Sequence, residues 1–508
     1  HHDPQQPLSF RPLPEERQRS RQCLGEQCSE VIDIQKNIQK RIIQKTINKI
    51  NMTKNKQKNS LGSTIAVSLT NYLDAGAIVA GASGLTLWQN YLGLSEANLG
   101  WLNALSANCL GAATGAIIGG FLADRYGRKF IYTYNMLVYM LGVIIIMLAC
   151  NFPMLLAGFL ITGISVGVGV PASWTYISEN SETGNRGRNI GISQMAWGIG
   201  PTIILILGTL LAPPTTTADS AGALFPIVQS IAQTLGGNDV NGAALNVYSS
   251  RIIFFSLFIV AFIAWLLQRR LHESKEWEDA KAEAAEHHQS SFGGFKSLFT
   301  VRRNVKTMLF LCGMYLTWNL VSSVMGFFQQ HIYETAGGLS NQFANMLTVG
   351  QWLIIIATTF VFSMIVDKVN QRWLYFTGVS FAVLAWVLVI FVGINNLTGL
   401  LVFTLLWGLQ GGVSVQSFYA LWASELFPAR YRAAAQGVMF FIVRGLSALW
   451  GIGFVYIYGE NGEGFTTAAF VMLGLLLVSL IIGTVGAPQT RGKSLEEITH
   501  ERYGSDEI

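Results

Sequence analysis

Charged residues are scarce in this sequence: Asp, Glu, Lys and Arg make up 12% of its 508 residues, whereas 51% are hydrophobic. A soluble chain of this length carries about a quarter charged residues, so the composition excludes an ordinary soluble domain and predicts an integral membrane protein. The formal net charge is +5. Because the basic residues are sorted by connecting segment and form no single patch, this excess indicates membrane topology and argues against a nucleic-acid partner.

Residue groupings typical of enzymes are also missing. The five cysteines have no metal-ligand spacing, and Cys109, Cys150 and Cys312 lie in apolar runs, where cysteine acts as a small buried hydrophobic residue. The sequence shows neither a nucleophile with a neighbouring base nor a glycine-rich loop for ATP. We therefore expect no enzymatic activity, no catalytic residue, no metal site and no cofactor.

Long apolar runs dominate the rest of the sequence. Each has the roughly 17 to 25 residues that a helix needs to cross the hydrocarbon core, and lipid offers an unpaired backbone no other partner. We therefore predict an all-α membrane protein with twelve transmembrane helices, at about residues 64–90, 98–122, 130–150, 153–177, 189–212, 249–267, 305–328, 344–366, 373–393, 397–424, 433–457 and 465–486.

The basic residues predict how these helices are oriented. Of 34 Lys and Arg residues, twelve precede the first run, seventeen lie in or beside alternate connections, three follow the last run, and two lie within runs. The other connections contain none, including the long segment 213–248, which either caps the outer vestibule or is a disordered loop. The positive-inside rule then predicts a multi-pass protein of the plasma (inner) membrane with both termini cytoplasmic.

The charged connections repeat between the first six and the last six predicted helices. The stretch "GFLADRYGRKF" places Asp124, Arg125 and Arg128 after the second helix, and "VDKVNQRW" places Asp367 and Arg372 after the eighth. The two stretches occupy corresponding places in the two sets of six, which indicates an internal duplication.

A second repeat follows the fourth and the tenth helix. Glu179 precedes Arg186 by seven residues, with Arg188 close behind, and Glu425 precedes Arg432 by seven. Two related six-helix halves are a known plan of membrane transporters, in which the substrate site lies between the halves near mid-membrane. Single acidic-basic loops would be weak evidence, but four matching elements in corresponding places favour this plan.

These observations divide the chain into five segments. The polar start contains a basic, loosely amphipathic stretch that suits either a disordered extension or an anionic membrane surface. We expect an N-terminal cytoplasmic extension, an N-terminal six-helix bundle, a cytoplasmic linker, a C-terminal six-helix bundle and a cytoplasmic tail, at residues 1–63, 64–267, 268–304, 305–487 and 488–508.

Four of these stretches resemble a known family. "GFLADRYGRK", the Glu-to-Arg pairs, "SELFPARYRAAAQG" and the tail "PQTRGKSLEEI" resemble the major facilitator superfamily, and within it most the sugar porters, over roughly residues 60–500. The resemblance implies two pseudo-symmetric six-helix bundles, the major facilitator fold, and secondary active transport of a small-molecule solute by alternating access. We expect a monomer that imports a sugar or polyol together with protons, as a symporter does.

Opposite charges at helix ends can hold the two halves together on one side of the membrane. Each such pair at a wet interface contributes about 1 kcal/mol, so several together form a switch that can still open. The plainer interpretation is that these residues only determine topology. We predict a cytoplasmic gate formed by Asp124, Arg125, Arg128, Glu179, Arg186, Arg188, Asp367, Arg372, Glu425 and Arg432.

Two ionisable residues lie deep inside predicted spans. Asp74 is about midway along the first helix, and Arg444 lies twelve residues beyond Arg432, about 18 Å into the eleventh. The resemblance places Asp74 at the protonation site of proton-coupled sugar porters; a structural partner of an arginine and a substrate contact are the alternatives. In those porters an arginine of the fourth helix regulates this aspartate, but here the matching residue is Phe159, and Arg444 could take its place.

Candidate substrate contacts come from neutral polar and aromatic residues within spans. Sugar sites combine hydrogen-bonding groups with an aromatic platform, and Gln194 matches a sugar-contacting glutamine of the resembled family; packing between helices is the plain alternative for the others. The predicted substrate-binding residues are Gln194, Trp318, Asn319, Gln416, Tyr419, Trp422 and Arg444.

Two other functions remain open at this stage. A guanidinium such as that of Arg444 binds carboxylates and phosphates, so an organic anion or a sugar acid is an alternative substrate. A non-transporting nutrient sensor on the same fold is the alternative from another class, although such a sensor typically carries a sizeable signalling domain, and the tail after the last helix has only about 20 residues.

Overall fold

The fold was analysed in a computed structural model of the chain, which describes residues 61–95, 98, 101–102, 105–107, 109–214, 221–286, 291–339, 341–413, 415–459 and 462–504. The predicted extension before residue 61, with Cys23 and Cys28, lies outside the described residues. Every regular element within the described residues is a helix.

Eleven helices among the described residues are long and apolar enough to cross a membrane. These helices carry large apolar side chains on the outer surface of the protein, as lipid contact requires. Phe391, for example, is 82% exposed and Val485 is 76% exposed. The eleven are Leu61–Leu92, α4 (Arg128–Met147), α5 (Phe152–Asn180), α6 (Arg186–Leu210), α8 (Gly242–Gln268), α11 (Arg302–Thr335), α12 (Asn341–Ile365), α13 (Gln371–Val392), α14 (Leu397–Gly412) continued by α15 (Val415–Glu425), α16 (Arg432–Tyr458) and α17 (Phe465–Gly486).

The one predicted span not among these eleven is the second in chain order; it corresponds to α3 (Leu110–Tyr126), which has 17 residues. The sequence predicted this span at 98–122; α3 itself runs from Leu110 to Tyr126, and the described residues Asn98, Trp101, Leu102 and Leu105 before it are also helical. The 17 residues of α3 are at the lower limit for crossing the hydrocarbon. With α3, the described part of the chain contains a helix for each of the twelve spans expected from the sequence.

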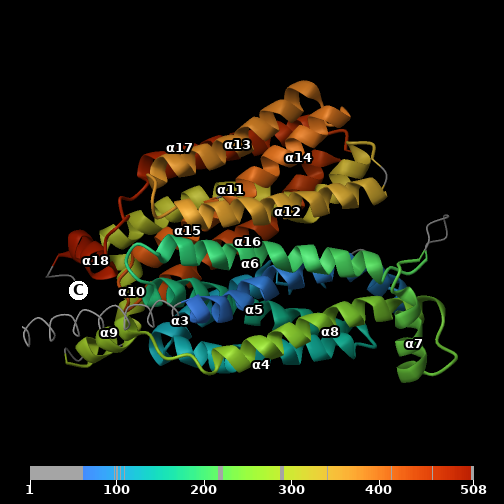
Figure 1. Cartoon of the computed structure of the whole chain (residues 1–508), viewed down its shortest axis with the longest axis horizontal. Coiled ribbons are helices and arrows are strands. Elements are labelled where there is room, and N and C mark those ends of the chain that lie inside the picture. Colours follow the sequence, from blue (N-terminus) through green and yellow to red (C-terminus); the bar gives the residue numbers. More distant parts are fainter. Residues whose placement is uncertain are drawn as a thin grey trace, which may run out of the picture. The chain divides into compact units, whose positions relative to one another are not determined.

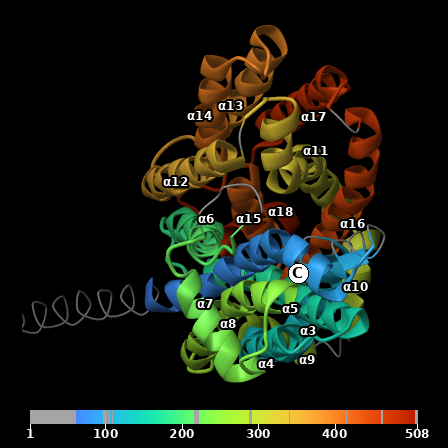
Figure 2. The ribbon, with the colours of Figure 1, turned by 90° about the vertical axis from the view of Figure 1, so that its right-hand side faces the viewer.

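The helices form two groups. In Figures 1 and 2, α12, α13, α14 and α17 lie on one side of the bundle, and α3, α4, α5 and α8 lie on the other. Within the first group α13 packs against α14 and α17, and within the second α4 packs against α5 and α8. The groups meet where α3 packs against α16 and where α6 packs against α12.

Glycines allow the close approach of α3 and α16. A Cβ atom on Gly120 would lie 2.6 Å from the carbonyl oxygen of Ala433, and one on Gly437 would lie 2.3 Å from that of Ala116. Both distances are too short for any side chain, so the backbones of the two groups touch here. This contact brings Asp124, one turn beyond Gly120, to the start of α16.

The connections rich in charged residues lie together at one end of the bundle, which we call the charged end. The short helices α9 (Lys275–Glu286), α10 (Ser291–Thr300) and α18 (Leu495–Tyr503) lie at this end, on the left in Figure 1. Ser494 caps α18 in a capping box with Glu497. The phenol of Tyr503 then donates to Asn304, at the start of α11, over 2.6 Å, which fastens the tail to the second group.

The opposite end carries α7 (Phe225–Gly236), part of the long segment 213–248. Its buried side chains are Phe225, Val228 and Ala232, and the helix packs against α8. Residues 221–248 of this segment are therefore largely helical, while 215–220 lie outside the described residues. Whether α7 caps an outer vestibule stays a prediction.

Candidate functional site

Glu179, near the end of α5, is the centre of the charge network at the charged end. Its carboxylate accepts hydrogen bonds from Arg128 over 2.8 and 3.1 Å and from Arg432 over 2.8 Å. The three side chains are buried, and Arg128 belongs to α4 whereas Arg432 begins α16 of the other group. Glu179 therefore joins one arginine of each group.

Arg186 and Glu425 form the corresponding pair in the opposite sense. The Arg186 Nε and Glu425 Oε1 atoms lie 3.0 Å apart, and both side chains are almost fully buried. Arg186 also donates to the backbone carbonyl of Lys493 in the tail. Each glutamate of the sequence repeat thus pairs with the arginine of the other repeat, seven residues after the other glutamate.

Two aspartates accept hydrogen bonds from helix N-termini of the opposite group. Asp124 accepts from the backbone N–H groups of Ala433 and Ala434, over 3.3 and 2.6 Å, in the first turn of α16. Asp367 accepts from those of Gly187 and Arg188, over 3.0 and 2.7 Å, in the first turn of α6. The first N–H groups of a helix have no partner within it and favour a negative charge, so both contacts connect the groups.

The segment after α8 and the first turn of α9 complete this network. Ser274 donates to Glu179 over 2.6 Å, and the indole of Trp277 donates to the carbonyl of Asp124 over 2.8 Å. Glu273 accepts from the backbone N–H groups of Arg128 and Lys129, both over 3.0 Å, at the start of α4. The sequence analysis assigned no role to Glu273, Ser274 or Trp277, although "LHESKEW" was the signal that could have identified them.

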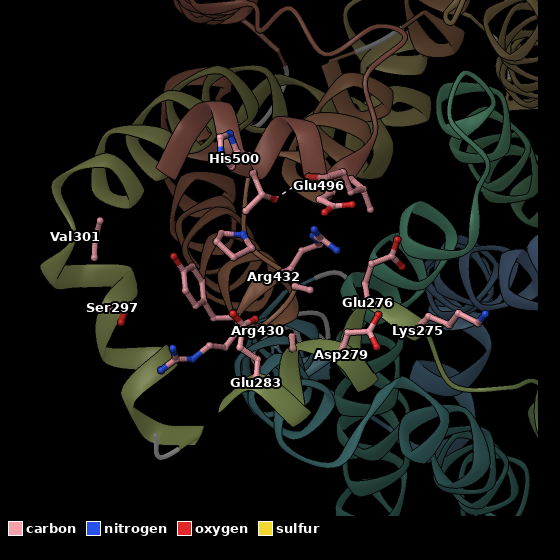
Figure 3. Close-up of a pocket in the computed structure, with 16 residues that line it drawn as sticks. Lys275, Glu276, Asp279, Glu283, Ser297, Val301, Arg430, Arg432, Glu496 and His500 are labelled. Carbon is pink, nitrogen blue, oxygen red and sulfur yellow. Dashed lines mark hydrogen bonds between the residues drawn. The ribbon is translucent and has the colours of Figure 1, made fainter. Parts of the chain in front are cut away.

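A pocket of about 540 Å³ opens beside this network. Figure 3 shows Glu276 and Asp279 of α9 on one side, Glu496 and His500 of α18 on another, and Arg432 between them. Burial, together with the negative charge of Glu179, raises the pKa of Glu276 to about 7. Burial also raises the pKa of Asp367, although the N–H groups of Arg188 and Gly187 act against this shift.

The side chains of three predicted gate residues form none of these contacts. The side chains of Arg125 and Arg188 are exposed, and the guanidinium of Arg125 lies over the ring of Tyr126. Arg372 is half-buried and forms no ion pair within the described part of the chain. The structure therefore brings seven of the ten predicted gate residues together.

Asp74 and Arg444 are close to each other inside the bundle. Asp74 Oδ2 lies 3.5 Å from Arg444 Nη2 and accepts a hydrogen bond from the indole of Trp197 over 3.1 Å. Asp74 is 1% exposed, and its Oδ1 atom has no partner among the described residues. The helix Leu61–Leu92 of one group and α16 of the other thus meet through an ion pair. The sequence suggested Arg444 as a partner of Asp74 but could not show that the two residues are close.

A small central cavity of about 60 Å³ lies between α6 of one group and α11, α12, α14 and α15 of the other. Gln416 donates to Gln194 over 2.9 Å across the two groups, and the indole of Trp318 donates to Gln410 over 3.0 Å. The lining residues are Gln194, Trp197, Trp318, Ser322, Gly326, Gln329, Gln351, Trp352, Ile355, Thr359, Trp407, Gln410, Gly411 and Gln416.

The other predicted substrate contacts lie outside this lining. Asn319 donates to Ser447 over 2.8 Å, and the ring of Tyr419 stacks on Tyr315 with centroids 4.1 Å apart. The indole of Trp422 donates to Gln371 over 3.0 Å, near the charged end.

Several lining residues were missed by the sequence analysis. They are the glutamines Gln329, Gln351 and Gln410 and the tryptophans Trp197, Trp352 and Trp407. A glutamine within an apolar span was the available signal, because a buried amide requires a partner. Gln329 and Gln351 meet this requirement by bonding to each other over 2.8 and 3.1 Å.

No group of three or more His, Cys, Asp or Glu side chains within the described residues could hold a metal ion. The helix arrangement and the crossed ion pairs define a helical, multi-pass membrane protein built of two matched groups that meet around a central cavity. The chain belongs to the Major Facilitator Superfamily, whose family model matches residues 64–452. It is therefore a membrane transporter, as the sequence resemblance implied.

The chain is similar to transporters of small polyhydroxy compounds. It is 40% identical to the minor myo-inositol transporter IolF of Bacillus subtilis (strain 168) over 451 residues, which cover 87% of this chain and 94% of that protein. It is 24% identical to the arabinose-proton symporter of the same organism over 418 residues, 78% of this chain and 85% of that one. The solved proton:xylose symporter XylE, bound to 6-bromo-6-deoxy-D-glucose, superposes with a TM-score of 0.68 at 17% identity, covering 88% of this chain and 99% of XylE.

Proposed function

We propose that this transporter imports a neutral sugar or polyol together with protons by alternating access. The names of two relatives support the substrate class and the coupling, since one is a myo-inositol transporter and another an arabinose-proton symporter. The relative at 40% identity favours a cyclic polyol such as an inositol within this class.

The composition of the central cavity is the observation that carries the proposal. Its lining contains five glutamines and four tryptophans and no charged side chain. Primary amides both donate and accept hydrogen bonds, as hydroxyl groups do, and indole rings offer flat apolar surfaces for the faces of a ring-shaped polyol. The Nε2 atom of Gln194 is buried without a partner among the described residues, so it can donate to a solute at no loss of an existing bond.

The cavity in this conformation is too small for a sugar or polyol. At about 60 Å³ it is smaller than the roughly 300 Å³ of the smallest typical ligand pockets. A solute would have to replace the Gln194–Gln416 and Gln329–Gln351 hydrogen bonds with its own hydroxyl groups. We propose that binding opens these two amide pairs, of which Gln194–Gln416 spans the boundary between the groups.

The alternative substrate, an organic anion or sugar acid, receives less support. It requires a free guanidinium in the cavity, but Arg444 lies outside the lining and faces the carboxylate of Asp74. In our proposal Asp74 takes up and releases the transported proton, and Arg444 is its partner. Substrate contacts of Asn319, Tyr419, Trp422 and Arg444 stay predictions for another conformation.

We place the charged end on the cytoplasmic side of the plasma membrane, on the basis of the positive-inside rule. Residues 64–267 and 305–487 would then be the two moving bundles, 268–304 their linker, and 1–63 and 488–508 the cytoplasmic termini. The gate, closed in this conformation, would consist of Asp124, Arg128, Glu179, Arg186, Asp367, Glu425 and Arg432. The side chains of Arg125, Arg188 and Arg372 would join it in another conformation.

Two measurements test the proposal. In a thermal-shift assay of purified protein, a ligand at 100 times its dissociation constant adds about 2.7 kcal/mol to stability, so neutral polyols and sugar acids can be screened side by side. A hit among the polyols should also be accumulated by proteoliposomes when a proton gradient is imposed. Stabilisation by sugar acids alone, lost in Arg444→Gln, would overturn the substrate class, and binding without any transport would favour the nutrient sensor.

A further inference from the structure

Trp197 is the side chain that connects the central cavity with the buried ion pair. Its indole N–H donates to Asp74 Oδ2 over 3.1 Å, while its ring lines the cavity. The same ring meets Trp352 of α12, with centroids 5.4 Å apart and planes inclined by 51°. The ring of Trp197 is therefore in contact with whatever fills the cavity, and its N–H is bonded to the carboxylate of Asp74.

The helix that carries Trp197 is weakened at this residue. Pro201 lies inside α6, four residues further on. Proline has no N–H to offer the carbonyl of the residue four positions earlier and crowds it, so the carbonyl of Trp197 lacks its usual helical partner. Gly198 and Gly200 flank the same turn. A small bend here would move the indole relative to Asp74 without breaking the remaining helix.

The neighbouring contacts make the position of Trp197 dependent on the solute. Gln194 lies three residues earlier and therefore on the same face of α6, and it bonds across the cavity to Gln416. A solute that replaces this bond lies beside the rings of Trp197 and Trp352, which both line the cavity. Filling the cavity must then shift either ring or the helix turn that carries one of them.

On the carboxylate side, Asp74 Oδ2 is shared by Trp197 and Arg444, whereas Oδ1 has no partner among the described residues. Other titratable groups that interact with this pair are Tyr139 of α4 and Tyr315 of α11, and Cys109, which interacts with Arg444. The indole N–H and the guanidinium of Arg444 approach the same carboxylate oxygen, Oδ2. Movement of the indole changes the number of donors to this oxygen.

We propose that Trp197 is the coupling residue of this transporter, a positioning residue that transmits occupation of the cavity to Asp74 through its indole N–H. The inference rests on the proposed function, because it requires solute transport coupled to protons. It goes further by assigning the link between the two sites to one hydrogen bond, Trp197 Nε1 to Asp74 Oδ2. Loss of that bond should uncouple the proton from the solute while the cavity still binds.

The test compares Trp197→Phe with Trp352→Phe in proteoliposomes. Both substitutions keep an aromatic wall, but only the first removes a donor to Asp74. For each variant we would measure counterflow exchange of labelled polyol without a gradient, accumulation driven by a proton gradient, and protons taken up per solute. Trp352→Phe should raise the KM of exchange and leave the number of protons per solute unchanged.

Because the ring of Trp197 also lines the cavity, Trp197→Phe should exchange polyol with a raised KM, as Trp352→Phe does. In addition it should lower gradient-driven accumulation about tenfold, the effect of one lost charge-assisted hydrogen bond, and reduce the protons taken up per solute. An unchanged proton-to-solute ratio would overturn the inference, as would equal uncoupling by Trp352→Phe. If the unmodified protein itself exchanges no polyol, or exchanges it without any proton movement, the proposed function fails instead.

Discussion

Glu179 of α5 and Arg432 of α16 lie 2.8 Å apart, although 253 residues separate them in sequence. Arg186 and Glu425 form the matching pair over 3.0 Å. In sequence each glutamate stands near the arginine of its own half, but in space each contacts the arginine of the other half. The duplicated motif therefore forms two ion pairs that both connect the halves.

Replacement of Glu179 should open the contact between the halves. Glu179→Gln keeps the shape of the side chain but leaves the buried guanidiniums of Arg128 and Arg432 without a carboxylate, and breaking a buried pair in this way costs about 3–5 kcal/mol. A cysteine at Ser178, whose hydroxyl donates to the carbonyl of Ser424 across the interface, reports opening by its rate of maleimide labelling in a variant free of native cysteines.

Labelling of Ser178→Cys should be slow in the parent protein and accelerate strongly with Glu179→Gln. Glu182→Gln is the matched control, because Glu182 lies three residues further on and forms no ion pair within the described residues. Equal labelling rates for Glu179→Gln and Glu182→Gln would show that the network does not hold the halves together.

The glycine contact between α3 and α16 predicts a second route to the same opening. In Gly437→Ala the new methyl group would lie 2.3 Å from the carbonyl oxygen of Ala116, and overpacking of this kind costs about 1–3 kcal/mol. Gly451→Ala on the same helix is the control, since nothing lies within 4 Å of its added methyl group. We expect faster Ser178→Cys labelling for Gly437→Ala only; a similar rate in both variants would contradict a tight contact.

The closed charged end should respond to pH through Glu276. The pKa of Glu276 is raised from 4.5 to about 7 by burial and by Glu179, so this conformation binds the proton more tightly than one in which the side chain is hydrated. By linkage, the closed conformation loses stability as the pH rises from 4.5 through 7. Asp367, whose pKa burial also raises, acts in the same direction.

Because maleimide reacts with the thiolate, each labelling rate is divided by that of the same cysteine in the unfolded protein at the same pH. This relative rate for Ser178→Cys in detergent should be lower at pH 6 than at pH 8. In Glu276→Gln it should be low at both values, because an amide imitates the protonated acid. Glu278→Gln, an exposed position on the same helix, should keep the full dependence on pH. Persistence of that dependence in Glu276→Gln would assign the titration to another group.

The extent to which sequence determined this structure differs between the fold and the site. Apolar length and the sorting of basic residues suffice for twelve spans and their alternation, since both follow from the bilayer. Local detail was less accessible: within the span predicted at 98–122 the helix α3 is Leu110–Tyr126, and the span predicted at 397–424, found as Leu397–Glu425, is interrupted at Val413 between α14 and α15. At that break, a Cβ atom on Gly412 would lie 2.0 Å from Thr358 Oγ1, a tertiary contact that no local pattern contains.

The candidate site required information on the packing of helices. Asp74 and Arg444 were evident because a charge within a span is costly, but their separation of 3.5 Å depends on how two distant helices meet. Gln351 and Gln410 were overlooked since a single amide in an apolar run resembles a packing residue. Trp422 and Tyr419 have suitable chemistry, yet their rings face Tyr375 and Tyr315 and not the cavity.

Binding of the solute should depend on the cavity glutamines. Gln194→Ala removes an amide that bonds across the cavity, and one or two hydrogen bonds of about 1 kcal/mol each correspond to a KM raised roughly 5- to 30-fold. Asn319→Ala is the control, because Asn319 bonds to Ser447 outside the lining. Exchange assays should show the larger KM change for Gln194→Ala; the reverse order would place the solute nearer to Asn319.

The Asp74–Arg444 pair allows a double-substitution test of its two roles. Arg444→Gln alone leaves a buried carboxylate and Asp74→Asn alone leaves a buried guanidinium, so each should lower thermal stability, by an amount on the order of 3–5 kcal/mol. The double variant contains no uncompensated charge and should recover much of that loss. Recovery of stability is expected without recovery of proton coupling: proton-driven accumulation should be absent in both variants that lack Asp74, while counterflow exchange returns in the double variant. Stability losses that simply add would show that the two side chains do not interact, and accumulation by Asp74→Asn would exclude Asp74 as the site of proton coupling.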